Sequence, residues 1–350
     1  MVSIVAKKYN YVVGVDTHAR RHVLCLINNL GERLGIYECR VLTKDFSQVL
    51  SLIKRKTNDA RLLFAVEGTS SYGETFTGFL IRDGQAVCEV RPPKTKVRGS
   101  IGKNDAIDAE LAALSVLTLP VDRLAIPRAF GERKKLRILL ASRNILIKQQ
   151  TMNKNALLAL VRCLDTLIDA REALSMDTVA QIASCRIVGR DLKAVGMLEA
   201  RRLAKEILTL AKQLKDNEKQ LKDLVAAVAS SLLRLHGVGA VCGAQIICSY
   251  SHKGRIRSPE AFVALAGVAP IPASSGNTNR HRLNRFGDRA LNCALDIITK
   301  TRMRTDEETK RYIKKRTKEG MAMRDIRRAL KRYIARSIFK HLETLNLGID

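Results

Sequence analysis

Tryptophan is absent from the sequence, and other aromatic residues are few, with 7 tyrosines and 8 phenylalanines among 350 residues. Acidic charge is also scarce, because 62 lysines and arginines stand against 34 aspartates and glutamates, a formal net charge of +28. Such a chain is suited to a polyanionic partner, and nucleic acid is the partner we expect. Since few aromatic side chains are available to stack on bases, we expect its contacts to be made mainly to the sugar–phosphate backbone.

Long apolar runs and paired cysteines are missing as well. No uninterrupted apolar stretch approaches the roughly 18 residues that a membrane-spanning helix needs, and the first residues lack the apolar core of a secretory signal. We therefore expect no membrane partner. The eight cysteines are dispersed and form no Cys-x-x-Cys pair, which argues against a structural zinc site and a disulfide framework and fits a reducing cytoplasm.

The basic excess is spread along the whole chain. Residues 1–130 contain 19 basic and 13 acidic residues, residues 131–230 contain 19 and 11, and residues 231–350 contain 24 and 10. A localisation tag would concentrate the charge in one segment, whereas a protein that lies along a polyanion carries it throughout. The three segments also differ in pattern, and a chain of 350 residues is long enough for two or three domains.

Residues 1–130 alternate between short apolar runs and amphipathic stretches. The first three runs predict a hairpin meander, and the fourth, Leu62-Leu63-Phe64-Ala65-Val66, predicts a strand covered on both faces. His18 and His22 straddle the first predicted turn, and we interpret them as ordinary surface residues. The predicted strands are 11–16, 22–27, 34–39, 62–66 and 86–90, and the predicted helices are 45–54, 75–82 and one that follows Gly102.

Carboxylates follow the apolar runs of this segment. Asp16 ends the first run, Glu67 ends the fourth, and Asp105 and Asp108 lie three residues apart at the start of the last helix. Taken alone, Asp105 and Asp108 are equally well a solvated first helical turn. Ligands of an open α/β sheet gather beyond the carboxyl ends of its strands, and four carboxylates there would repel one another without cations. We therefore predict a site for two Mg²⁺ (or Mn²⁺) ions that assist phosphodiester chemistry.

Residues 131–230 are helical in pattern. A basic helix is predicted over 133–167, followed by a break from Cys185 to Gly196 and by a seam whose members are spaced four and three apart. Such a seam forms a coiled coil, either within the chain as an antiparallel helix pair or between chains, and the pattern does not decide between them. Its one polar member fixes the register, a device that points to a specified partner. The seam is Leu203, Ile207, Leu210, Leu214, Asn217, Leu221, Leu224 and Val228.

Residues 231–350 return to a globular pattern with three features that suit nucleic acid. Residues 235–239 and the apolar helix after them predict a helix-hairpin-helix element, in which Gly237 and Gly239 present backbone N–H groups to phosphate; a plain glycine turn is the alternative. The basic stretch 308–345 predicts a helix that faces nucleic acid rather than solvent alone. Guanidinium groups that follow the loop Ser274-Ser275-Gly276 predict phosphate binding, and they are Arg280, Arg282, Arg285 and Arg289. Loop chemistry alone does not make Ser275 a nucleophile.

Three motifs in residues 1–130 carry a family resemblance. They are Val13-Gly14-Val15-Asp16-Thr17-His18, Val66-Glu67-Gly68-Thr69-Ser70-Ser71-Tyr72 and Lys103-Asn104-Asp105-Ala106-Ile107-Asp108-Ala109. Together they resemble the RuvC-like half of the DEDD insertion-sequence transposases, which are bridge-RNA-guided recombinases related to the pilin-gene invertases. The resemblance implies a ribonuclease-H-like fold with the four carboxylates as a metal-binding tetrad. The sequence departs from the family at Asn104, where Thr is usual, at Ala106, where a charged residue is usual, and at 68–70, where Ala-Thr-Gly is usual.

A second resemblance concerns residues 231–350. The stretch 262–270, the pair Ser275-Gly276 and the stretch 285–291 are similar to the second transposase domain of the same family. The family's catalytic serine precedes a glycine, so the resemblance selects Ser275 as a nucleophile that forms a phosphoserine link to DNA beside a DEDD site from another subunit. It also implies that the middle segment is a coiled coil that assembles oligomers and contacts RNA.

These observations lead to one prediction with two alternatives. We predict an α/β + α protein with a RuvC-like domain at 1–130, a helical coiled-coil segment at 131–230, and a mostly α-helical transposase domain with a helix-hairpin-helix element at 231–350. Its predicted function is transposition by a DEDD site with Mg²⁺ (or Mn²⁺) and the nucleophile Ser275. The predicted partners are DNA, a guide RNA and further copies of the chain, in a dimer or tetramer. The predicted location is the cytoplasm of a bacterial or archaeal cell, at the nucleoid. The predicted nucleic-acid-binding residues are Lys103, Gly237, Gly239, Arg280, Arg282, Arg285 and Arg289.

The alternatives belong to other classes. A metal-dependent, junction-resolving endonuclease would use water as its nucleophile, and Ser275 would then be only a loop residue. A non-catalytic nucleic-acid-binding protein would keep the basic charge but would not depend on divalent ions.

Overall fold

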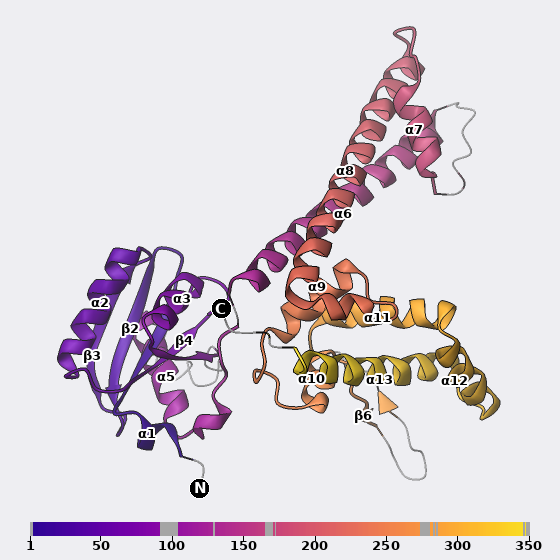
Figure 1. Cartoon of the computed structure of the whole chain (residues 1–350). Coiled ribbons are helices and arrows are strands. Elements are labelled where there is room, and N and C mark those ends of the chain that lie inside the picture. Colours follow the sequence, from indigo (N-terminus) through magenta and orange to yellow (C-terminus); the bar gives the residue numbers. More distant parts are fainter. Residues whose placement is uncertain are drawn as a thin grey trace. The chain divides into compact units, whose positions relative to one another are not determined.

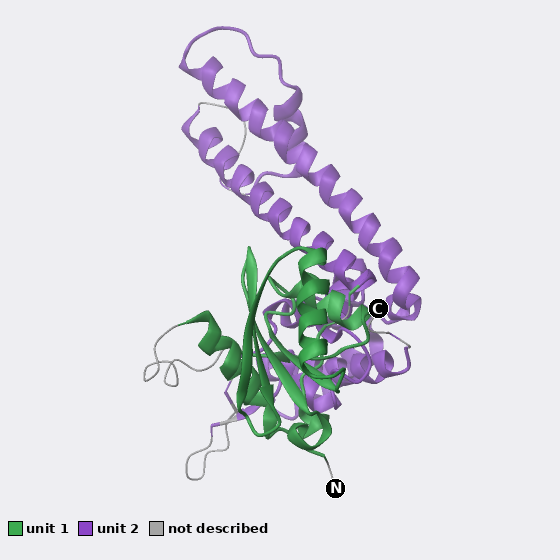
Figure 2. Cartoon of the chain, turned by 90° about the vertical axis from the view of Figure 1, so that its left-hand side faces the viewer, with its two compact units in different colours: residues 1–130 green, residues 131–350 purple. Residues whose placement is uncertain are grey.

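A computed structural model of the chain describes residues 3–91, 104–128, 130–164, 171, 173–273, 281, 282, 284, 286–345 and 347. The chain divides into two compact units, residues 1–130 and residues 131–350 (Figure 2). The predicted helical segment and the predicted C-terminal domain therefore lie in the same unit. Among the described residues, no helix combines the length and the apolar character needed to cross a bilayer.

The first unit is built on a five-stranded sheet with the order β3-β2-β1-β4-β5 (Figure 1). β2 pairs antiparallel with β1 and β3, which confirms the predicted meander, whereas β1, β4 and β5 run parallel. β4 is buried from Leu62 to Val66, as its unbroken apolar run predicts. The strands are β1 (Tyr11–Thr17), β2 (Arg21–Asn28), β3 (Arg33–Arg40), β4 (Leu62–Glu67) and β5 (Ala86–Val90).

Helices cover both faces of this sheet, so the unit has three layers (Figure 1). Successive side chains of a strand point to opposite faces, and β1 therefore serves both: Val12 packs in the layer of α1 and α5, and Val13 in the layer of α2 and α3. The helical elements are α1 (Val5–Lys8), α2 (Thr43–Lys56), α3 (Glu74–Arg82), α5 (Asp105–Leu117) and the short 3₁₀ turn η1 (Val121–Arg123).

Sheet and helix approach each other very closely at Gly14 of β1. A Cβ atom at this position would lie 1.9 Å from the carbonyl oxygen of Ala109 and 2.6 Å from the backbone nitrogen of Ala113, so only glycine fits. The buried alanines of α5, Ala109, Ala112 and Ala113, are the matching small surface on the helix. This contact fixes α5 against β1 and thereby brings the first turn of α5 to the carboxyl end of β1.

The second unit is helical, and its longest elements form an antiparallel pair, α6 (Glu132–Cys163) with α8 (Leu192–Ala229) (Figure 1). The Asn217 side chain donates to the Leu139 carbonyl at 3.1 Å, and the Gln150 side chain donates to the Ile207 carbonyl at 3.4 Å, which sets the antiparallel register. Ile207, Leu210, Asn217 and Leu221 of the predicted seam are buried. The seam therefore packs within the chain, the first of its two alternatives.

Two boundaries of this segment differ from the prediction. The first helix ends at Cys163 rather than at residue 167, since Leu164 is already extended. The break ends earlier than Gly196, because the Asp191 side chain accepts a hydrogen bond from the Ala194 N–H at 2.9 Å and starts α8 at Leu192. Gly196 lies inside the helix, where a Cβ atom would come within 2.6 Å of the Leu164 side chain.

The rest of the second unit packs around a core that contains Tyr250, Phe262 and Phe339. It includes a short hairpin of β6 (Ile271–Pro272) and β7 (His281–Arg282). The helical elements are α7 (Met176–Ser184), η2 (Ser230–Arg234), α9 (Ala240–Tyr250), α10 (Pro259–Leu265), α11 (Arg289–Thr305), α12 (Glu307–Lys318) and α13 (Met323–Glu343).

Candidate metal centre and nucleic-acid-binding residues

Asp16 and Glu67 lie at the carboxyl ends of neighbouring parallel strands. The β1–β4 register pairs Val15 with Val66, so the next residue of each strand is a carboxylate. The Thr17 hydroxyl donates to the Glu67 carbonyl at 2.9 Å and ties the two strand ends together. Gly68 then turns the chain with a φ of +65°, a conformation that favours glycine. The strand-end prediction for these two acids therefore matches their backbone positions.

Asp105 and Asp108 lie in the first turn of α5, and Asn104 determines where that turn begins. The Asn104 side chain accepts from the Ala106 N–H at 3.1 Å, which makes it the N-cap. Asn and Thr are both favoured N-cap residues, so the departure from the family's usual Thr keeps the cap. The helix N-terminus also favours the negative charge of both aspartates.

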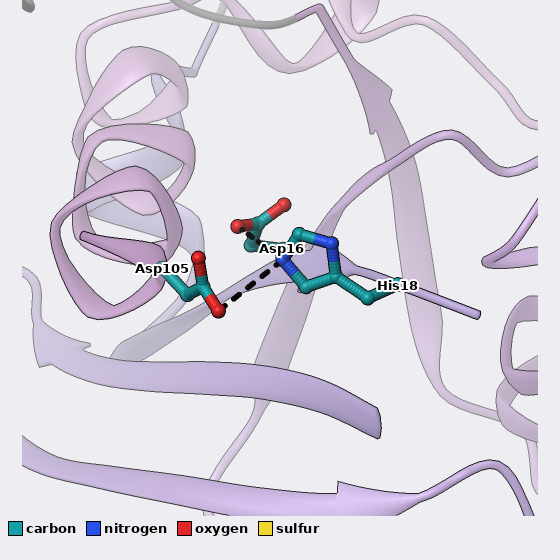
Figure 3. A group of neighbouring side chains, drawn as sticks. All are labelled: Asp16, His18 and Asp105. Carbon is teal, nitrogen blue, oxygen red and sulfur yellow. Dashed lines mark hydrogen bonds and ion pairs between the residues drawn. The ribbon is translucent and has the colours of Figure 1, made fainter. Parts of the chain in front are cut away.

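The carboxylates of Asp16 and Asp105 meet at the imidazole of His18 (Figure 3). The His18 Nε2 atom lies 3.2 Å from Asp16 Oδ2 and 3.5 Å from Asp105 Oδ2. Among the described residues these three form a group whose candidate ligand atoms all lie within 4.8 Å of one another. The structure thus brings together two of the four predicted carboxylates with one residue that the sequence analysis assigned to the surface.

The electrostatics of Asp16 reflect this crowding. Burial raises the pKa of Asp16, His18 opposes that rise, and Asp108 and Asp105 raise the pKa further. Asp16 and Asp108 are 7% and 5% exposed, so neither carboxylate is held by bulk water alone. Arg21 also borders the group, with Nη2 lying 3.5 Å from Asp105 Oδ2. Like charges gathered in a half-buried site are a common arrangement for binding a cation.

His18 could have been identified from strand geometry. It follows Asp16 by two residues, directly after β1 ends at Thr17. Residues i and i+2 of a strand point to the same face, and extending that alternation by one residue puts His18 on the face of Asp16. His22 differs from the prediction in the opposite way, because it is fully buried beside the rings of Phe46 and Phe76. The sequence analysis read both histidines as surface residues from their position at a turn, and that reading was wrong for His22.

The donor set suits a divalent cation. Carboxylate oxygens are the ligands that Mg²⁺ and Mn²⁺ prefer, and an imidazole nitrogen is a good additional ligand for Mn²⁺. The remaining two predicted carboxylates are close in structure, since Glu67 ends the strand beside Asp16 and Asp108 shares the helical turn of Asp105. A metal bound here would stand at the carboxyl edge of the sheet, where ligands of α/β sheets gather.

Gly237 and Gly239 flank a turn between η2 and α9. Gly237 has a φ of +82°, and a Cβ atom there would lie 3.1 Å from the Ile298 carbonyl oxygen, so this glycine is required for packing on α11. Gly239 is the N-cap of α9, and a Cβ atom there would meet no atom within 4 Å. The structure therefore gives the two glycines different environments: Gly237 faces the protein, and Gly239 borders open space at a helix N-terminus.

The predicted basic residues are only partly described. Arg282 lies on β7 and Arg289 begins α11, and both side chains are exposed. Lys103, Ser275, Arg280 and Arg285 lie outside the described residues. β6 and β7 pair with each other, and Ser275 lies between them in the sequence.

Comparison with known families identifies the chain. A model of DEDD transposases of the IS110 type, described as "Transposase", matches residues 13–165, and a model described as "Transposase IS116/IS110/IS902 family" matches residues 229–314. A search of curated proteins found no match. The two family models together cover more than half of the chain, and the first contains all four candidate carboxylates. The chain therefore belongs to the IS110 family of transposases and is a DNA-transposing enzyme.

Proposed function

We propose that this transposase cleaves and rejoins DNA strands with a carboxylate-held divalent ion site in the first unit and the hydroxyl of Ser275 as nucleophile. The observation that carries the proposal is the meeting of Asp16 and Asp105 at the edge of the sheet, next to Glu67 and Asp108. The strand order, with an antiparallel meander followed by two parallel strands, supports the ribonuclease-H-like fold that the sequence motifs imply.

Asp16, Glu67, Asp105 and Asp108 would hold the ions. When bound, Mg²⁺ or Mn²⁺ supplies Lewis-acid stabilisation of the negative charge that develops on phosphate oxygens. The chain's own residues set the geometry: Gly14 and the alanines of α5 place the helix, Asn104 fixes its first turn, and Thr17 joins the two strand ends. His18, held between two carboxylates, orients both.

Ser275 would attack the scissile phosphorus. A bond forms between its Oγ and phosphorus, and its hydroxyl proton is lost to a base. The bond from phosphorus to the leaving deoxyribose oxygen breaks, and that oxygen takes up a proton to become a hydroxyl. A hydroxyl of the incoming strand then reverses these steps and releases the serine. Each phosphodiester broken is replaced by another, so no free DNA end and no external energy source are required. Arg282 and Arg289 are placed in the sequence to neutralise charge on the phosphate.

The proposed partners also include a guide RNA and further copies of the chain. The formal charge of +28 supports a large nucleic-acid contact. An apolar row on the outer face of α6 supports oligomerisation, since Ile138, Ile145 and Met152 are seven residues apart and 58%, 65% and 70% exposed. Sedimentation equilibrium of Ile145→Lys would measure this: we expect a smaller assembly than the parent, and an unchanged mass would exclude this row as the interface. We place the protein in the cytoplasm, at the nucleoid.

A covalent protein–DNA adduct is the decisive measurement. The parent chain, Ser275→Ala and Asp105→Ala are incubated with Mg²⁺, element-end DNA and co-expressed RNA, then separated on a denaturing gel. We expect an adduct only in the parent chain. Cleaved DNA that appears without an adduct, and persists in Ser275→Ala, would instead identify an endonuclease that uses water.

A further inference from the structure

A basic cleft lies in the second unit, and one predicted site residue, Arg282, lines it. It encloses about 800 Å³ between α13 and the turn that leads into β6. Residues 267–270 line one side, and residues of α13 line the other. The charged side chains that line it are Arg282, Arg324, Asp325, Arg328, Lys331 and Arg332.

Positive charge dominates this cleft. Its one carboxylate, Asp325, is already paired, with Arg328 at 3.2 Å and Arg324 at 3.8 Å. The five cations therefore exceed the negative charge inside the cleft by four. Anions are attracted by such an excess, and arginine is the side chain best suited to phosphate because its planar group donates to two oxygens at once.

Arg332 is held in place at the cleft by a neighbouring ring. Its guanidinium lies over the Tyr333 ring, 5.5 Å from the ring centre. Its Nε atom is buried and has no hydrogen-bond partner among the described residues. Since that atom has no exposed surface, an anion in the cleft would contact the outer nitrogens of the same guanidinium.

The cleft is held rigid by a bridge of three groups. The Lys331 ammonium donates to the Asn292 side-chain oxygen at 2.7 Å, and the Asn292 side-chain nitrogen donates to the Ala266 carbonyl at 2.7 Å. This bridge joins α13, α11 and the segment before β6. Lys331 is only 12% exposed and also pairs with Asp296 at 3.4 Å, so it acts mainly as a support. The arginines are then the groups available to a ligand.

The ligand is better matched by a polymer than by a small anion. Arg324 also lines a second depression of about 600 Å³, together with Lys300, Arg304 and Arg327. The basic surface thus continues over α11 and α13 beyond the first cleft. Phosphates of a single strand repeat along its backbone every few ångströms, so one strand can contact several of these cations in turn.

We propose that this cleft binds the sugar–phosphate backbone of the DNA strand next to the scissile phosphate. The choice of DNA rests on the proposed function: Arg282 of β7 lines the cleft, and β6 and β7 flank the segment in which Ser275 occurs. Arg324, Arg328 and Arg332 are the phosphate-binding groups. A guide RNA carries the same phosphodiester chemistry, and the test distinguishes the two.

The test measures binding without chemistry. The full chain with Ser275→Ala, in EDTA, is titrated into fluorescent single-stranded DNA and RNA of the same sequence over a range of salt concentrations. Arg324→Gln/Arg328→Gln/Arg332→Gln is compared with Lys44→Gln/Arg55→Gln/Lys56→Gln, which removes the same charge from exposed positions on α2 of the first unit. Because strand cleavage is blocked throughout, the result stands whether or not Ser275 is the nucleophile.

We expect the cleft variant to lose about 100-fold in DNA affinity at 0.1 M salt and to lower the slope of log affinity against log salt by about 2, because each phosphate contact contributes roughly 0.7 to that slope. A comparable loss for RNA also supports a backbone site. The proposal is overturned if the cleft variant binds DNA like the α2 variant, or if only RNA binding is lost. Should the triple variant fail to fold, Arg324→Gln/Arg328→Gln changes two partly or fully exposed residues and should lower the slope by about 1.4.

Discussion

The two units assemble charged groups by opposite means. In the first unit, Asp16 and Asp108 are 7% and 5% exposed and are placed by close packing between a strand and a helix. In the second unit, Arg324 and Arg328 are 75% and 39% exposed and project from one long helix. A metal ion needs its ligands fixed within a few tenths of an ångström, whereas a flexible polyanion needs many cations along a surface. The packing of each unit matches the precision that its proposed ligand requires.

The same contrast holds for the glycines at close contacts. Gly14 in the first unit faces backbone atoms, which cannot move without displacing α5. Gly196 in the second unit faces only the end of the Leu164 side chain, which can change its rotamer. A rigid contact in one unit and a compliant one in the other predict different responses to the same substitution.

The largest expected effect is on the carboxylate group itself. Asp16→Asn removes a negative charge that would help to bind the divalent ion. Because a bound ion contributes several kcal/mol of transition-state stabilisation, we expect the cleavage rate to fall by about 10³-fold. Single-turnover cleavage of element-end DNA at saturating Mg²⁺ measures it. Asp45→Asn, which changes a carboxylate paired with Arg40 in the first turn of α2, is the matched control and should cleave like the parent. Cleavage by Asp16→Asn at the parent rate would exclude Asp16 from the active site.

The glycine substitutions should differ by a smaller amount. Gly14→Ala should destabilise the first unit by about 3 kcal/mol or more, because overpacking against backbone cannot be relieved by a rotamer change. Gly196→Ala should change stability by less than about 1 kcal/mol, since the helix propensity of alanine offsets the contact with Leu164. Amide hydrogen exchange in β1 and in α8 measures the two effects in the intact chain. Equal destabilisation by both substitutions would contradict the contrast between the units.

Strand-level periodicity predicted most of the first unit. Apolar runs placed the five strands to within one or two residues, and the position of Asp16 and Glu67 after two of them predicted their place at the sheet edge. The close contact at Gly14 was not predictable in this way. Its signal is a single glycine in an apolar strand and three alanines about a hundred residues later, and neither pattern indicates that they are in contact.

The second unit was less predictable for a physical reason. A seam with a four-and-three spacing buries equally well against the same chain or another one, so local pattern could not select the α6–α8 pair. The cleft of α13 depends on a bridge through Asn292 between three segments of the chain. The basic stretch 308–345 predicted a helix that faces nucleic acid, but it did not predict a cleft. His18 was missed because its turn position outweighed the strand alternation that pairs it with Asp16.

The smallest effect that we expect is a change in the stability of the first unit with pH. Burial lowers the pKa of His22 to about 4, so the native state stays unprotonated while the unfolded state, with a pKa near 6.5, takes up a proton as the pH falls. Stability is therefore lost below about pH 6.5, and at pH 5 the first unit should be weaker by about 2 kcal/mol. His22→Phe, which keeps an aromatic ring beside Phe46, should remove this loss of stability, measured by amide hydrogen exchange in β1 and β4.

His252 provides the control in the second unit, because burial lowers its pKa to about 4 as well. The His22→Phe variant should therefore leave the acid sensitivity of hydrogen exchange in α9 unchanged. If the variant loses acid sensitivity in both units, the two units unfold together. If both units keep their acid sensitivity, His22 does not control the acid sensitivity of the first unit.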